Sequence, residues 1–241
     1  MTSAVSLSGV GRTIGERTIL KGVELHVAPG EFVCVVGGSG CGKSSLLNVV
    51  SGLDAPTSGT VRVPGGRPAL MFQEHALFPW LTAGGNIEFA LELGGVPKRE
   101  LRCEAEELLR LVRLPDAYGH RIHELSGGMR QRVALARALA RGSDVLLMDE
   151  PFAALDAITR DLLHEELTRV WTERKLTVLF VTHNVREAVR LGQRVVLMTA
   201  GPGRIARTWE VGIPYPRRAE DPEVSALSRE ITGRLREEIG E

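Results

Sequence analysis

The chain has 241 residues, of which 43% are hydrophobic and 25% charged, a composition that is typical of a folded globular protein and excludes a disordered one. The 30 Lys and Arg residues balance 30 Asp and Glu residues, so no basic field attracts nucleic acid or anionic lipid. No apolar run approaches the roughly 18 residues that span a bilayer. The N-terminus shows no secretory signal, and the three cysteines lack CxxC spacing, so we expect a cytosolic protein without disulfides or a zinc site.

The first part of the chain is predicted to form strands and turns. Residues 5–7 and 23–27 have strand patterns, and the Pro29-Gly30 turn leads into residues 32–36. This last segment is continuously apolar, which is typical of a strand buried on both faces. After about residue 78 the pattern becomes helical, with apolar residues of segment 101–112 recurring at helical spacing.

The second half alternates between the two patterns. Residues 144–148, 177–181 and 194–198 are short apolar segments that predict buried strands, and segment 163–171 predicts a helix between the first two. Strands that alternate with helices, with a helical block between them, predict an α/β fold with a mainly parallel sheet and a helical insertion. A last helix is expected after Asp221-Pro222-Glu223, packed on its own domain.

A glycine-rich segment follows the first buried strand. Residues 37–44, with the sequence GGSGCGKS, fit the pattern GxxxxGK[ST] between a strand and a predicted helix. Backbone N–H groups of such a loop surround phosphate oxygens, Lys43 reaches the outer phosphates, and the Ser44 hydroxyl supplies an oxygen to Mg²⁺. Lys43 is one of only four lysines. The segment therefore predicts a nucleotide-binding site.

Two acidic residues end another apolar strand. Asp149 and Glu150 follow residues 145–148, which places carboxylates at the carboxyl end of a strand, where α/β sheets bind ligands. Asp149 is suited to hold Mg²⁺ through water. Glu150 is suited to orient and polarise the water that attacks the terminal phosphate.

A second anion-binding element is predicted at residues 125–131, LSGGMRQ. Ser126 is placed to cap the helix that follows, and Gly127 and Gly128 allow close backbone approach. Because this element lies 83 residues after Lys43 in a different structural context, the arrangement suggests a site shared between two copies of the chain. An ordinary capped helix is the alternative interpretation of this segment alone.

At this point the sequence resembles the ATP-binding subunits of ABC transporters, with the motifs in the family's order over nearly the whole chain. Residues 37–44 resemble Walker A, residues 145–150 Walker B, and residues 125–131 the signature segment. The resemblance implies a P-loop NTPase core with a mainly parallel sheet, an N-terminal antiparallel β-subdomain, and a helical subdomain inserted at about residues 79–141. Residues 1–241 would form one ABC ATPase domain whose tail and last helix occupy residues 214–241.

The resemblance also implies roles for single residues. Gln73 resembles the Q-loop residue that senses Mg²⁺ and the γ-phosphate, His183 resembles the switch histidine that contacts the γ-phosphate, and Asp156 resembles the D-loop residue that links two sites. Glu150, His183 and Gln73 are then the catalytic candidates, and Ser44, Gln73 and Asp149 the candidates for holding Mg²⁺. The expected nucleotide-binding residues are Gly37, Gly38, Ser39, Gly40, Cys41, Gly42, Lys43, Ser44, Ser45, Ser126, Gly127, Gly128, Asp156 and Ile14.

The implied assembly is a head-to-tail dimer, of this chain or with a paralogous ATPase subunit, that holds two ATP molecules between Walker A of one copy and the signature of the other. Segments 73–82, 148–160 and 201–205 resemble the nitrate, aliphatic sulfonate and taurine branch of bacterial importers. The expected partners are transmembrane permease subunits, through them a substrate-binding protein, and no nucleic acid. The expected location is the cytoplasmic face of the cell membrane. The Phe78-Pro79-Trp80 segment is a candidate lining for the permease groove, and a local hydrophobic cluster is the alternative interpretation.

Two residues lead to specific expectations. Ile14 aligns where the family usually places an aromatic residue against adenine, so we expect weaker or less base-selective binding unless Arg12 or Arg17 stacks instead. Cys41 lies at a helix N-terminus, which is expected to acidify its thiol and make it reactive.

Two other functions share parts of this pattern. A signature-bearing ATPase acting on nucleic acid is one, but those proteins usually show coiled coils, fused cassettes or basic patches. A P-loop kinase for a small metabolite is the other, and it leaves residues 125–131 and 154–156 without a role.

Overall fold

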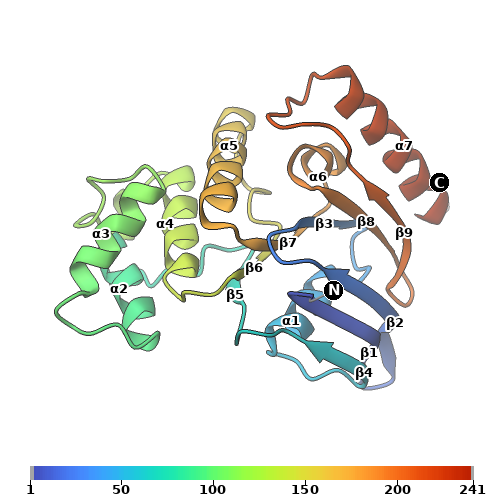
Figure 1. Cartoon of the computed structure of the whole chain (residues 1–241), viewed down its shortest axis with the longest axis horizontal. Helices are drawn as coiled ribbons and strands as arrows, with labels where there is room; N and C mark the ends of the chain where they lie inside the picture. Colours follow the sequence, from blue (N-terminus) through green and yellow to red (C-terminus); the bar gives the residue numbers. More distant parts are fainter. Residues whose placement is uncertain (1–2, 240–241) are drawn as a thin grey trace.

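The computed structural model describes residues 3–239, so residues 1, 2, 240 and 241 of the predicted domain lie outside the described part. Its strands form two sheets, and its helices lie in separate groups around the larger one (Figure 1). Among residues 3–239, no helix combines the length and hydrophobicity required to cross a membrane.

The smaller sheet is antiparallel and has the order β2-β1-β4, formed by β1 (Val5–Ile14), β2 (Arg17–Val27) and β4 (Ser58–Arg62). Burial alternates along much of β1 and β2, which is the pattern of strands with one face on a core. Gly59 is required where β4 crosses β1, because a Cβ atom there would lie 2.4 Å from the backbone carbonyl of Gly9.

The larger sheet has six strands in the order β5-β6-β7-β3-β8-β9. Its members are β5 (Ala69–Met71), β6 (Val145–Asp149), β7 (Thr177–Thr182), β3 (Phe32–Gly37), β8 (Arg194–Thr199) and β9 (Arg204–Glu210). The first five strands are parallel, and β9 pairs with β8 in the antiparallel direction. The predicted fold class, an α/β core with a mainly parallel sheet and an antiparallel β-subdomain, is confirmed.

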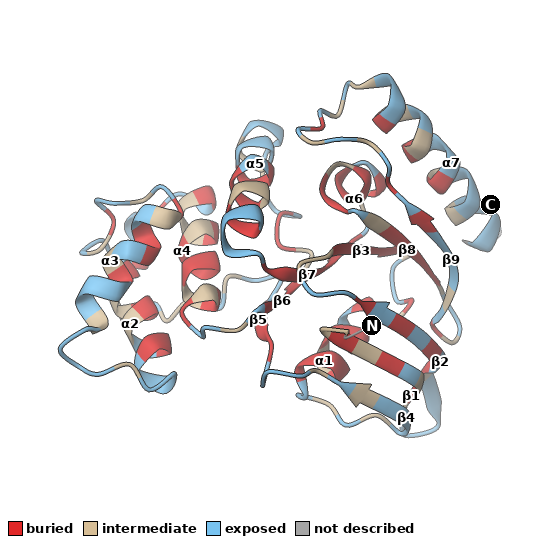
Figure 2. Cartoon of the chain, in the orientation of Figure 1, coloured by how far each residue is buried: buried red, intermediate tan, exposed pale blue. Residues whose placement is uncertain are grey.

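Two hydrophobic cores lie on opposite faces of this sheet, because successive side chains of a strand point to opposite faces. Phe32, Cys34 and Val36 of β3 belong to one core, whereas Val33 and Val35 belong to the other. Figure 2 shows buried residues throughout the central strands and along the inner sides of the surrounding helices. We name the core with Phe32 the helical-side core and the core with Val33 the P-loop-side core.

The P-loop-side core lies between the sheet, the small sheet and α1 (Lys43–Ser51). The helical-side core lies against α5 (Ala157–Arg174), α6 (Val185–Leu191) and α7 (Pro222–Ile239), and it extends into the helices inserted between β5 and β6. These inserted elements are α2 (Ala83–Leu93), α3 (Leu101–Leu111), the short 3-10 helix η1 (Ile122–Glu124) and α4 (Gly127–Leu139), and they form a group beyond the β5 edge of the sheet (Figure 1).

The segment that leads to α7 is held in place by hydrogen bonds from a buried arginine. Arg217 donates hydrogen bonds to four backbone carbonyl oxygens, those of Val189, Gly192, Val211 and Ile213. Its guanidinium also lies over the ring of Tyr215, 4.1 Å from the centroid. The end of α6 and the connection after β9 are therefore held together, which fixes where α7 starts.

Candidate functional site

The carboxyl ends of four neighbouring strands form the candidate site. Residues 38–45 follow β3, Glu150 follows β6, His183 follows β7 and Gln73 comes two residues after β5. Because these four strands are adjacent and parallel, their carboxyl ends meet at one edge of the sheet, which is where open α/β sheets bind ligands. The structure thus brings the predicted P-loop and the three catalytic candidates to the same edge.

The P-loop holds its lysine in a defined position. Lys43 begins α1 and is only 6% exposed, and its ammonium group donates to the carbonyl oxygens of Gly37 at 2.9 Å and Gly38 at 3.1 Å. Gly42 adopts a φ of +100°, and a Cβ atom there would lie 2.8 Å from Leu20 Cδ2. The loop therefore needs glycine at this position for its backbone conformation and for its contact with β2.

Cys41 contradicts the expected reactivity. Its side chain is 1% exposed, and burial raises the pKa of its thiol, although nearby Lys43 opposes this shift. The expectation of an acidic, reactive thiol is wrong, because desolvation of the thiolate outweighs the attraction of the ammonium group. Cys41 instead packs in the P-loop-side core, below the phosphate-binding backbone.

The two acids at the end of β6 lie in different environments. Burial raises the pKa of Asp149, while the hydroxyl of Ser44 and the ammonium of Lys43 act in the opposite direction. Glu150 places one carboxylate oxygen 3.8 Å from Lys43 Nζ and the other 2.7 Å from His183 Nδ1. A hydroxyl and a carboxylate oxygen, as on Ser44 and Asp149, are hard donors that suit Mg²⁺.

Glu150 also has an unusual backbone conformation. Its φ is +43°, in the left-handed region that L-amino acids other than Asn and Asp seldom adopt, and its N–H donates to the carbonyl oxygen of Val181 at 2.9 Å. This turn directs the carboxylate toward Lys43 and His183. Gln73 lies exposed at the same edge, on the neighbouring connection after β5.

The signature segment forms the start of α4. Ser126 caps the helix by accepting a hydrogen bond from the N–H of Met129 at 3.2 Å, as predicted from its position. Gly128 packs so closely on α5 that a Cβ atom would lie 2.5 Å from Thr159 Cγ2. Asp156 caps α5 through the N–H of Thr159 at 3.0 Å, and this backbone hydrogen bond lowers its pKa. The signature and Asp156 are thus joined through Thr159.

The signature and the P-loop belong to different packing layers of one chain. Helix α4 packs against α2, α3, α5 and β5, whereas α1 packs against β2, β3, β4 and β6. Figure 1 shows α4 in the group beyond β5 and α1 beside the small sheet. This separation favours the predicted use of the two elements by different copies.

Ile14 lies at the end of β1 and is 54% exposed. Arg12 is engaged elsewhere: its guanidinium donates to the Ala55 carbonyl at 2.9 Å and pairs with Asp54 at 3.2 Å. Arg12 therefore has a structural partner, and Arg17, exposed at the start of β2, remains the arginine available to stack on a base.

An apolar groove is lined by Phe78 of the Phe78-Pro79-Trp80 segment, but not by Pro79 or Trp80. It has a volume of about 350 Å³, lies between the end of α1 and α2, and is lined by Leu53, Phe72, Phe78, Phe89 and Leu93 among others. Several of these large apolar side chains are exposed, as is Trp80 at 67%. An exposed apolar groove of this kind is typical of a protein–protein contact.

A buried polar network behind His183 was not predicted. His164 of α5 hydrogen-bonds Glu187 of α6 at 2.7 Å, and the other oxygen of Glu187 accepts a bond from Thr182, the residue before His183. All three side chains are buried. The network fixes the end of β7 from which His183 projects. The three residues share no sequence spacing that could have indicated it.

The fold and this site define an ATP-binding cassette, and the comparison with known proteins agrees. The family description "ABC transporter" matches residues 20–153, and the chain belongs to that family.

The relatives specify the class further. The chain is 50% identical over 207 residues to the taurine import ATP-binding protein TauB of Mesorhizobium japonicum, covering 83% of this chain and 80% of that protein. It is 43% identical to the aliphatic sulfonates import ATP-binding protein SsuB of Bacillus subtilis, covering 90% and 86%. Among solved structures, the dimeric ABC transporter cassette MJ0796 is similar with a TM-score of 0.76 and 34% identity, covering 87% of this chain and all of that one.

Proposed function

We propose that this chain is the ATP-hydrolysing subunit of an importer for small sulfonates or related oxyanions, working as a head-to-tail pair. The observation that carries the proposal is the meeting of the P-loop, Glu150, His183 and Gln73 at one sheet edge, with the signature presented on a separate layer. Relatives named for taurine, aliphatic sulfonate and nitrate import support the substrate class. They do not favour the kinase or the nucleic-acid ATPase.

The P-loop binds the phosphates of ATP. Its backbone N–H groups and the N-terminus of α1 supply donors, and Lys43 exchanges its bonds to the Gly37 and Gly38 carbonyls for bonds to the outer phosphates. Ser44, Asp149 and Gln73 would hold Mg²⁺, which neutralises developing phosphate charge when bound. The solved MJ0796 cassette with ADP and phosphate supports a hydrolytic reaction in this fold.

Glu150 acts on the attacking water. Its carboxylate accepts a hydrogen bond from the water and orients it toward the terminal phosphorus. The 2.7 Å contact with His183 holds the carboxylate in this direction, and the Thr182, Glu187 and His164 network holds the backbone that carries His183. His183 and Gln73 contact the γ-phosphate, so its loss on hydrolysis releases both residues.

The second copy completes the site. Ser126, Gly127 and Gly128 of the partner would approach the γ-phosphate from the N-terminus of α4, and Asp156 would lie between the two sites. The similar MJ0796 cassette is a dimer, which supports this arrangement. Because ATP joins the two copies, hydrolysis separates them and supplies the motion for transport.

Glu150→Gln tests the reaction and the pairing together. The variant keeps the shape of the side chain and loses the carboxylate, so it is expected to bind ATP, to dimerise with ATP, and to hydrolyse it at least a hundredfold more slowly. Glu165→Gln is the control, because Glu165 is exposed on α5 away from the site. Wild-type turnover by Glu150→Gln would refute the role of Glu150.

The groove at Leu53, Phe72 and Leu93 is the proposed contact with a transmembrane permease subunit. Through that subunit the chain would sit at the cytoplasmic face of the membrane and work with a substrate-binding protein. Its apolar lining suits a short helix of the partner. Leu93→Asp is therefore expected to abolish co-purification of the chain with membranes. Leu162→Asp, the same change at an exposed position of α5, is expected to leave co-purification intact.

A tagged Glu150→Gln chain provides the direct test of this partner. Membranes solubilised with ATP present should yield a polytopic membrane protein with the chain, identified by mass spectrometry. Recovery of soluble or nucleic-acid-bound partners alone would contradict the importer function.

A further inference from the structure

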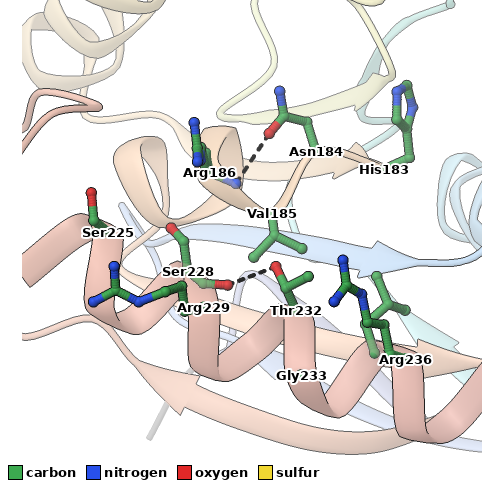
Figure 3. Close-up of a pocket in the computed structure, with 11 residues that line it drawn as sticks. His183, Asn184, Val185, Arg186, Ser225, Ser228, Arg229, Thr232, Gly233 and Arg236 are labelled. Atoms are coloured by element: carbon green, nitrogen blue, oxygen red, sulfur yellow. Dashed lines mark hydrogen bonds between the residues drawn. The ribbon is translucent and has the colours of Figure 1, made fainter. Parts of the chain in front are cut away.

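A cavity of about 790 Å³ lies between α6 and α7 and reaches the segment that begins with His183. Figure 3 shows its wall from α7, formed by Ser225, Ser228 and Thr232 on the side of the helix that faces α6. Arg186 comes from α6, and Arg229 and Arg236 come from α7. The proposed ATPase function uses His183 but gives no role to this cavity.

The charge of the cavity is one-sided. Three arginines line it, and none of the lining residues within residues 3–239 is acidic. Within residues 3–239, no ion pair is formed by Arg186, Arg229 or Arg236. By contrast, Arg234 on the same helix pairs with Glu237. The cavity therefore gathers three cations without acidic neighbours in its lining, and such a cluster attracts an anion.

A buried hydroxyl group provides a second, independent observation. Ser228 is 3% exposed, and its Oγ atom has no hydrogen-bond partner among the described residues. Its carbonyl oxygen is used, since Thr232 Oγ1 donates to it at 2.7 Å. An unpaired buried hydroxyl is unfavourable unless an acceptor satisfies it. Figure 3 shows this hydroxyl directed from α7 toward α6, so an acceptor inside the cavity would satisfy it.

We propose that this cavity binds a small organic oxyanion, a molecule with a phosphate or sulfonate headgroup. The headgroup oxygens would accept hydrogen bonds from Ser228 Oγ and from the guanidinium groups of Arg229 and Arg236. Arg229 follows Ser228 directly, and Arg236 lies about two helical turns further along α7. The volume exceeds that of an inorganic anion and falls in the range of small-molecule sites. Val185 and Leu235 provide apolar contact for the rest of the molecule.

The cavity is adjacent to the residues at the catalytic edge of the sheet, so a ligand bound in it can affect them. Asn184 follows His183, lines the cavity and caps α6 by accepting hydrogen bonds from the N–H groups of Arg186 at 3.1 Å and Glu187 at 3.3 Å. A bound anion would therefore touch the segment that positions the side chain of His183. This site is distinct from the P-loop, and it stands whether or not the transported substrate is a sulfonate.

Calorimetric titration of the whole chain with hexanesulfonate and with hexyl phosphate tests the proposal. Saturating Mg-ADP is present throughout, so that the P-loop cannot bind the probe. Arg229→Gln and Arg236→Gln are each expected to weaken binding about tenfold, since each removes a charge-assisted hydrogen bond. Ser228→Ala is expected to weaken it about threefold. Arg234→Gln is the matched control and is expected to bind like the wild type. The probe that binds more tightly identifies the headgroup.

Two results would overturn the proposal. One is the absence of binding beyond that of sodium chloride at equal ionic strength. The other is equal affinity of the wild type and the Arg229→Gln/Arg236→Gln double variant, with ADP binding of both chains unchanged to show that they are folded.

Discussion

Glu150 combines its proposed catalytic role with a backbone conformation that suits glycine. Its φ of +43° lies in the left-handed region, and its N–H is hydrogen-bonded to Val181. Replacing Glu150 by alanine removes the carboxylate but keeps the conformational cost, whereas replacing it by glycine removes both. The difference in stability between the two variants therefore reports the cost of the backbone conformation, less the extra backbone freedom that glycine loses on folding.

The magnitude follows from two opposing contributions. A left-handed conformation costs an L-residue about 1–2 kcal/mol. Glycine loses more backbone freedom on folding, which costs it about 0.5–1 kcal/mol relative to alanine. We therefore expect Glu150→Gly to be more stable than Glu150→Ala by about 0.7 kcal/mol, or about 1–3 °C in Tm for a chain of this size. Both variants are expected to lack ATP turnover.

Urea unfolding followed by circular dichroism measures this difference as a shift in midpoint at constant slope. Glu165, exposed within α5, provides the control with ordinary helical geometry, and there glycine should be less stable than alanine by about 1 kcal/mol. The expected signs at the two positions are thus opposite. A Glu150→Gly chain less stable than Glu150→Ala would refute the assignment of strain to this residue.

Three further predictions concern the site. Gly128→Ala should lower ATP turnover at least tenfold with little change in circular dichroism, because its Cβ would lie 2.5 Å from Thr159 Cγ2. Thr159→Ala, which removes that methyl group, should restore much of the activity in the double variant; no rescue would contradict the packing argument. In alkylation followed by mass spectrometry, exposed Cys103 should react quickly and buried Cys41 slowly with or without ATP, and rapid modification of Cys41 would contradict its burial. Ile14→Tyr should tighten ATP binding relative to GTP, measured by nucleotide titration, and no gain would exclude contact of residue 14 with the base.

The parts of the fold that the sequence could predict are those with strong local patterns. The buried apolar segments became β3, β6, β7 and β8, and the helical spacing of residues 101–112 became α3. By contrast, β5 has three residues, and β4 and β9 are largely exposed, so neither length nor hydrophobicity distinguishes them from loops.

The features of the site also fall into those that the sequence could predict and those that it could not. The P-loop and the acids of β6 lie on short contiguous segments whose neighbours in the fold follow from strand order, so their meeting was predictable. The burial of Cys41 was not, because it depends on the P-loop-side core, to which β1 and β2 contribute from another part of the chain. The contacts of Arg12 with Asp54 and of Thr159 with Gly128 likewise join distant segments.

The two cores described above have a mechanical consequence. Because alternate residues of each central strand serve different cores, the sheet separates the core that contains α1 from the core that contains α2, α3 and α4. Rotation of α2, α3 and α4 about the short β5 edge would repack side chains on one face only. Movement of these inserted helices would therefore leave the packing around the P-loop unchanged.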